Sequence, residues 1–133
     1  MQKSNIHDIL SDSTMSQYFE GNVEIKKLIT DKLTNDFETY LVSFENGART
    51  KLHYHEVDQV LLATEGKGIV VLQTKVEMID DNTGKIAMDE VHYLKPGDFV
   101  CVPALKWHWH GASEGERFAH YQIKKPGKTI WAQ

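Results

Sequence analysis

The chain has 133 residues, of which 41% are hydrophobic and 26% are charged, which suits one domain built around one core. Its formal net charge of −4 argues against a nucleic-acid partner, which needs a basic surface, and against an anionic membrane surface. The apolar runs are too short to span a bilayer and the N-terminus does not resemble a signal peptide, so we expect a cytoplasmic protein.

Nearly all predicted elements are strands. Residues 4–11 are the exception, because Ser4 or Asn5 is suited to cap one or two helical turns. The runs that follow are rich in Val, Ile, Leu, Thr and Tyr, and several of them are separated by glycine-containing turns; they cover 23–28, 39–44, 51–55, 59–65, 68–73, 75–79, 86–94, 98–102, 107–110 and 118–123. Short strands at regular spacing predict an all-β sandwich or barrel.

Other local features receive ordinary interpretations. Residues 80–84 are rich in oxygen ligands but lack the length and distal glutamate of an EF-hand, so they predict a hairpin turn. Cys101 is the one cysteine, which excludes an internal disulfide, and its apolar surroundings predict a small buried residue. His7 and His92 lie outside any motif, and we expect ordinary hydrogen-bonded roles for them.

Four of the seven histidines form two pairs with the same spacing, His53 with His55 and His108 with His110. In a strand, residues i and i+2 point to the same face, so each pair presents two imidazoles side by side. Two such imidazoles can converge on one ion without distorting the backbone. Gln59 begins the next predicted strand, where its amide oxygen can reach the same ion.

The first pair lies in a pattern that resembles the first motif of the cupin family, G-x5-H-x-H-x3-E-x6-G. Gly47, His53, His55 and Gly66 match it, and Gln59 stands where most cupins have Glu. The resemblance implies a double-stranded β-helix, which is a jelly-roll barrel, with a metal bound inside.

The second pair lies in a pattern that resembles the second cupin motif, G-x5-P-x-G-x2-H-x3-N. Gly97, Pro103 and His108 match it, whereas Leu105 and Ala112 depart from its Gly and Asn positions. These two are turn and packing positions, so the departures concern loop shape more than metal binding. By resemblance, the metal ligands are His53, His55, Gln59 and His108.

The resemblance also implies a domain organisation. The cupin domain would span 18–126, after an N-terminal extension at 1–17 and before a C-terminal tail at 127–133. Small cupins usually pair through sheet edges, so we expect a homodimer, with the residues before Val23 as a segment that can cross to the partner.

A narrower resemblance covers residues 44–50 and 106–112. These stretches are similar to a subgroup of small cupins that includes manganese-dependent hydroxynitrile lyases, which also use Gln as the fourth ligand. Members of that subgroup carry a further pocket histidine on a late strand, which here is His120. The resemblance implies one divalent transition metal per chain, manganese first, although a nitrogen and oxygen ligand set also suits Fe, Cu, Ni, Co or Zn.

Three functions remain open at this point. Neutral ligands leave the ion its full double charge, which favours a Lewis-acid enzyme acting on a small oxygen-bearing substrate, with His120 or His110 moving a proton. Reversible carbon–carbon cleavage of a cyanohydrin fits this chemistry. An iron or copper oxygenase is the second function, and a non-catalytic metal- or small-molecule-binding protein is the third.

Overall fold

The computed structural model describes residues 1–29, 34, 36–73 and 89–133. In chain order its elements are the 3-10 turn η1 (Ser16–Tyr18) and the strands β1 (Phe19–Glu20), β2 (Val23–Lys27), β3 (Glu38–Phe44), β4 (Arg49–Thr50), β5 (His53–His55), β6 (Gln59–Gly66), β7 (Gly68–Leu72), β8 (Glu90–Leu94), β9 (Phe99–Val102), β10 (His108–Ala112), β11 (Phe118–Lys124) and β12 (Thr129–Trp131). The described part of the chain is therefore nearly all β, as predicted. It contains no helix long and apolar enough to cross a membrane.

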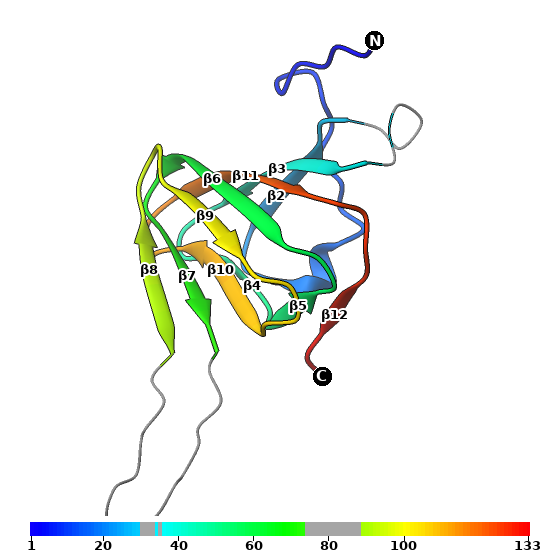
Figure 1. Cartoon of the computed structure of the whole chain (residues 1–133). Helices are drawn as coiled ribbons and strands as arrows, with labels where there is room; N and C mark the ends of the chain where they lie inside the picture. Colours follow the sequence, from blue (N-terminus) through cyan, green and yellow to red (C-terminus); the bar gives the residue numbers. More distant parts are fainter. Residues whose placement is uncertain (30–33, 35, 74–88) are drawn as a thin grey trace, which may run out of the picture.

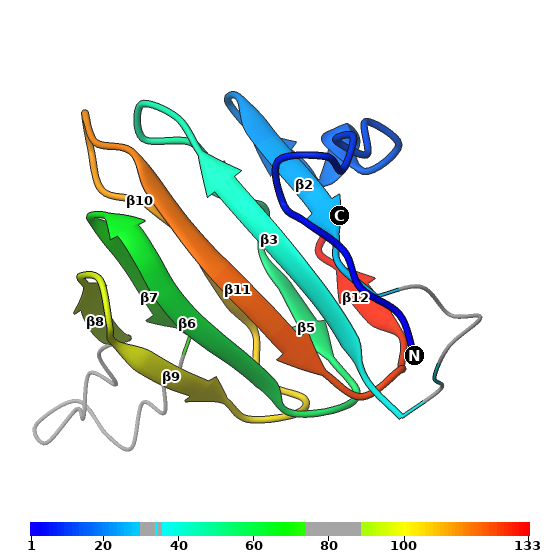
Figure 2. The ribbon, with the colours of Figure 1, turned by 90° about the horizontal axis from the view of Figure 1, so that it is seen from above.

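The strands form two antiparallel sheets that curl around a shared interior (Figure 1). Sheet 1 has seven strands, in which β10 pairs with β4 and β5 on one side and with β7 on the other, while β1, β12 and β8 lie farther out. Sheet 2 has five strands in the order β2-β3-β11-β6-β9 (Figure 2). This arrangement is the jelly roll expected from the sequence.

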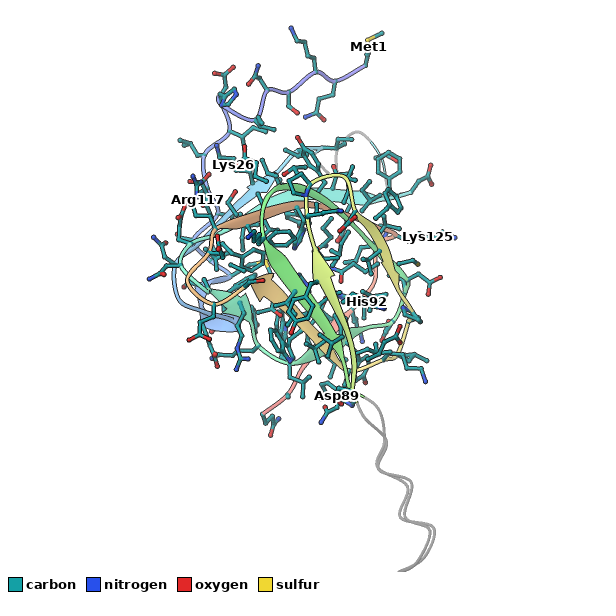
Figure 3. The ribbon with its side chains drawn as sticks, turned by 90° about the vertical axis from the view of Figure 1, so that its left-hand side faces the viewer. Met1, Lys26, Asp89, His92, Arg117 and Lys125 are labelled. Atoms are coloured by element: carbon teal, nitrogen blue, oxygen red, sulfur yellow. The ribbon has the colours of Figure 1, made fainter. Side chains whose placement is uncertain are left out.

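Alternation along the strands decides which side chains enter the interior. On β11, Phe118 and His120 are buried, and on β6 every second residue from Gln59 to Ala63 is buried. Phe44, Leu61 and Phe118 anchor the apolar part of the core at 0–1% exposure. By contrast, Arg117 and His92 point outward (Figure 3). The interior is thus apolar at one level and lined with histidines at another.

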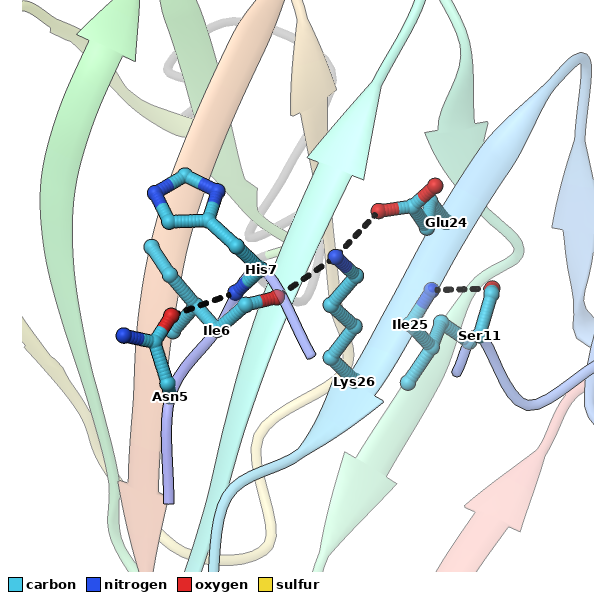
Figure 4. Close-up of polar contacts among 7 residues, drawn as sticks. All are labelled: Asn5, Ile6, His7, Ser11, Glu24, Ile25 and Lys26. Carbon is cyan, nitrogen blue, oxygen red and sulfur yellow. Dashed lines mark hydrogen bonds and ion pairs between the residues drawn. The ribbon is translucent and has the colours of Figure 1, made fainter. Parts of the chain in front are cut away.

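The N-terminal extension covers the free edge of β2 (Figure 4). The backbone N–H of Asp12 donates to the carbonyl of Ile25 at 2.8 Å, and the N–H of Ile25 donates to Ser11 Oγ at 3.2 Å. Lys26 Nζ donates to the carbonyl of Ile6 at 2.6 Å. Unpaired strand edges invite association with other chains, and this segment satisfies part of that edge within the same chain.

One local prediction is confirmed in part and one is wrong. Residues 6–8 form a single hydrogen-bonded turn and no α-helix, and Asn5 opens it: its side chain accepts from the backbone N–H of His7 and its carbonyl from that of Asp8. Cys101 is exposed. On β9, Val102 points into the core, so its neighbour Cys101 faces outward, and an unbroken apolar run does not reveal this difference.

Three predicted elements involve residues that the structure does not describe, and the predicted C-terminal tail contains a strand. The strand at 75–79, the start of the strand at 86–94 and the turn at 80–84 lie outside the described residues. The segment 127–133, expected as a tail, contains β12, whose Thr129 and Trp131 pair with His55 and His53. The C-terminal residues therefore lie directly beside the first histidine pair.

Candidate metal centre

Two neighbouring strands of sheet 1 bring the two histidine pairs together. His53 on β5 and His108 on β10 are opposite one another in the antiparallel register, with ring centroids 4.3 Å apart. The His55 ring lies 4.9 Å from His53 and 5.4 Å from His108. All three side chains are buried, at 0–5% exposure. The i, i+2 spacing seen in the sequence thus does place these imidazoles on one inner face.

The outer nitrogen of each of these three rings has a partner in the protein. Nδ1 of His53 lies 2.8 Å from the Lys51 carbonyl, and Nδ1 of His108 lies 2.8 Å from the Lys106 carbonyl. A carbonyl oxygen only accepts, so Nδ1 carries the proton in both rings and Nε2 keeps its lone pair. Nδ1 of His55 lies 2.8 Å from Thr129 Oγ1. This pattern of outer hydrogen bonds is typical of metal-binding histidines.

Gln59 reaches the same place from sheet 2. Its side chain is 1% exposed, and its Oε1 lies 3.2 Å from Nε2 of His108. Because Nδ1 of His108 donates to a carbonyl, these two atoms are both acceptors and do not satisfy one another. Nε2 of His55 is also buried without a hydrogen-bond partner among the described residues. Buried acceptors facing one another are costly unless a cation lies between them, so the donor set fits a metal ion.

Burial keeps these imidazoles neutral at ordinary pH. Desolvation, reinforced by the neighbouring His108, lowers the pKa of His53 to about 2 and that of His55 to about 3. Desolvation also lowers the pKa of His108. Neutral imidazole is the form that binds metals, so no proton needs to leave these rings before an ion enters.

His110 and His120, the two predicted catalytic residues, form a separate buried pair. Nδ1 of His110 lies 3.0 Å from Nε2 of His120, and the two rings are 2% and 0% exposed. Desolvation lowers the pKa of His120 to about 4 and holds that of His110 well below its usual value. His120 also contacts Phe44 and Phe118, with ring centroids 5.5 and 5.7 Å away. His120 therefore packs against the apolar core, and the His110 ring also lies 6.0 Å from Phe44.

His110 also lies close to the three rings predicted to bind a metal. Ligand nitrogens of His53, His108 and His110 all lie within 4.8 Å of one another, which is close enough for one ion to bind all three. This triad shares His53 and His108 with the ligand set implied by the sequence. It contains His110 and lacks His55 and Gln59.

A cavity of about 120 Å³ opens beside these histidines. Among the described residues, His53, His55 and His110 line it, whereas His120 does not. Glu38, Lys124 and Trp131 also line it, and sequence reasoning missed all three. The alternation along β11 that places His120 inward also places Lys124 inward, so this alternation could have predicted that Lys124 is buried. Trp131 was hidden because it was expected to lie in a tail.

Comparisons with known proteins identify the family of this chain. Residues 23–130 match the family model described as Cupin. The chain belongs to the cupin family. Over 117 residues, 86% of the chain, it is 30% identical to an (R)-mandelonitrile lyase from Granulicella tundricola, of which it covers 79%.

Solved structures of other proteins share this fold. A cupin-like protein from Thermotoga maritima has 32% sequence identity and a TM-score of 0.75, with 97% of this chain and 89% of that chain covered. The polyketide cyclase RemF from Streptomyces resistomycificus has the same TM-score at 14% identity, with 100% of this chain and 87% of that chain covered, which shows the fold alone.

Proposed function

We propose that this cupin is a divalent-metal-dependent lyase that cleaves a carbon–carbon bond next to an oxygen of a small substrate. His53, His55, Gln59 and His108 hold the ion. The observation that carries the proposal is the acceptor-to-acceptor approach of Gln59 Oε1 and His108 Nε2 at 3.2 Å in a buried site. The similarity to a mandelonitrile lyase supports the reaction class.

When bound, the ion would supply Lewis acidity to a substrate oxygen, and four neutral ligands would leave its double charge uncancelled. Manganese is our first choice because the resemblance to manganese-dependent hydroxynitrile lyases implies it, and nitrogen and oxygen donors without a thiolate are compatible with it. The ligand chemistry is shared with other first-row metals, so elemental analysis rather than geometry decides the identity.

The His110–His120 pair provides the proton transfer. His110 lines the cavity, and Nδ1 of His110 is occupied by His120, so Nε2 of His110 is the nitrogen free to take up and return a substrate proton. His120 does not line the cavity, and it acts as a positioning residue that fixes the ring and tautomer of His110. Both rings are neutral near pH 7, as a base requires.

His55 rather than His110 completes the ligand set in this proposal. Among the described residues, Nε2 of His55 is buried without a hydrogen-bond partner, whereas Nε2 of His110 is assigned to the proton transfer. A buried acceptor without a partner is costly, so Nε2 of His55 gains from an ion.

Elemental analysis of purified protein tests the ligand set. We expect about one ion per chain in the wild type and strong loss in His108→Ala and His55→Ala, because each substitution removes one of few donors. His110→Ala should keep the metal, and the exposed His92→Ala is the matched control, since His92 pairs with Glu90 on the surface of β8. Loss of metal from His110→Ala with retention in His55→Ala would assign the His53–His108–His110 triad instead. A wild type that holds no metal after reconstitution would reject the proposed function.

We further propose that two chains form a homodimer through the outer face of sheet 2. Phe99 and Ile123 project from this face at 64% and 37% exposure. Large exposed apolar side chains on one sheet face are typical of association surfaces.

A further inference from the structure

Lys124 places a buried charge beside the proposed metal ligands. In the register of sheet 2 it lies opposite Glu38 of β3 on one side and Gln59 of β6 on the other. Directly opposed residues in an antiparallel pair have Cβ atoms about 5 Å apart, so Lys124 is a close neighbour of Gln59. Its side chain is only 4% exposed and lines the cavity.

The Lys124 ammonium is incompletely satisfied by the protein. Nζ donates to Glu38 Oε2 at 2.8 Å and has a long contact of 3.4 Å to the Lys125 carbonyl. An ammonium has three donors, so among the described residues at least one N–H has no protein acceptor. A buried cation is costly unless its donors are used, and the cavity is the space from which a further acceptor can come.

The charges around the cavity favour an anion. Lys124 and Glu38 are its two charged lining residues in the described part of the chain, and they offset one another. The lining histidines are neutral, so the ion of the proposed site would leave the cavity with a net positive charge. A monoanion balances this charge better than a neutral molecule.

We propose that Lys124 is a specificity-determining residue that binds the carboxylate of a small organic acid in this cavity. The inference rests on the proposed function, because it names the substrate class of the same site. A carboxylate matches one free ammonium donor in a charge-assisted hydrogen bond, whereas a dianionic phosphate would also meet the Glu38 carboxylate. Glu38 competes with the substrate for Lys124 and holds the ammonium in place in its absence.

Paired probes test this inference. L-lactate and L-lactamide are similar in size but differ in charge, and calorimetry or ligand-observed NMR gives the dissociation constant of each. A hydrogen bond to a charged group predicts that the wild type binds lactate about tenfold more tightly than lactamide. The double variant Glu38→Gln/Lys124→Met removes both charges without leaving a lone carboxylate, and its lactate preference should fall to about one. Lys124→Arg should keep most of the preference.

Glu38→Gln alone separates a binding role from a structural one. It removes the competing carboxylate, so lactate should bind more tightly than in the wild type while lactamide changes little. No lactate preference in the wild type, or a preference unchanged in both Glu38 variants, would overturn the inference.

Each titration is run on metal-stripped and on manganese-loaded protein. The stripped protein reports the contribution of Lys124 without an ion. A lactate preference that depends on Lys124 in protein unable to hold metal would support this inference while rejecting the proposed function, so the two failures are distinguishable.

Discussion

Oε1 of Gln59 and Nε2 of His108 lie 3.2 Å apart in the interior, although the two residues come from different sheets. The proton of His108 is on Nδ1, which faces the Lys106 carbonyl, so neither facing atom has a hydrogen to donate. A cation bound by both atoms would satisfy these two buried acceptors.

Gln59→Glu should strengthen metal binding and weaken catalysis. A carboxylate adds a full negative charge beside the ion, which slows its loss, and cancels part of the charge that activates the substrate. We expect chelator-induced metal loss to slow by about tenfold or more, the equivalent of about 1.4 kcal/mol. Gln59→Ala is the comparison, and it should lose metal faster than the wild type. Faster loss from Gln59→Glu than from the wild type would argue against Gln59 as a ligand.

His110→Ala and His120→Gln should lower kcat while leaving the metal bound. Loss of a general base costs about 10²- to 10⁴-fold in rate, so His110→Ala should show a fall of that size in benzaldehyde release from mandelonitrile. His120→Gln should show a smaller fall, because an amide can still hydrogen-bond Nδ1 of His110, and His120→Ala a larger one. Turnover by His110→Ala at the wild-type rate would remove His110 from the reaction.

Acid should destabilise the metal-stripped protein. The pKa of His120 is about 4 in the folded chain, below its ordinary 6.5, so the unfolded chain binds more protons below pH 6.5. The free energy of unfolding should thus be constant above about pH 7 and fall as pH drops from 6.5 towards 4. At about 1.4 kcal/mol per pKa unit, His120 alone accounts for about 3 kcal/mol.

Urea unfolding at a series of pH values measures this dependence. The pKa of His55 is lowered to about 3, so the decline should continue below pH 4. His120→Gln should reduce the slope between pH 6.5 and 4 by the contribution of one histidine, and His92→Ala, at an exposed position, is the control. A stability that rises as pH falls through this range would contradict the burial of neutral histidines.

Phe99→Glu should weaken the proposed homodimer. Phe99 lies opposite Leu62 in the register, and Leu62 in turn lies opposite Tyr121, so an apolar row crosses the outer face of sheet 2. A buried unpaired carboxylate in this row would be costly, and sedimentation velocity should show a shift towards monomer. Tyr93→Glu is the control, because Tyr93 is 76% exposed but belongs to β8 of sheet 1. Equal shifts in both variants would argue against this face.

The sequence by itself determined the features that depend on local spacing. Alternation at period 2 placed His53 with His55 and His108 with His110 on inner faces, and turn residues between short apolar runs indicated an all-β barrel. The cupin motifs named the family from the same residues. These features depend on the conformation of one strand at a time, which the order of residues largely determines.

Only the tertiary structure decided which residues meet across strands and sheets. Glu38 and Lys124 are 86 positions apart, and no local pattern predicts their ion pair at 2.8 Å. His110 lines the cavity and His120 does not, although both side chains are buried on their strands. Cys101 faces outward because pairing with β6 sets the side of β9 that meets the core. Strand register and the closure of the two sheets depend on contacts between residues far apart in the sequence, because both are selected by burial of the whole interior.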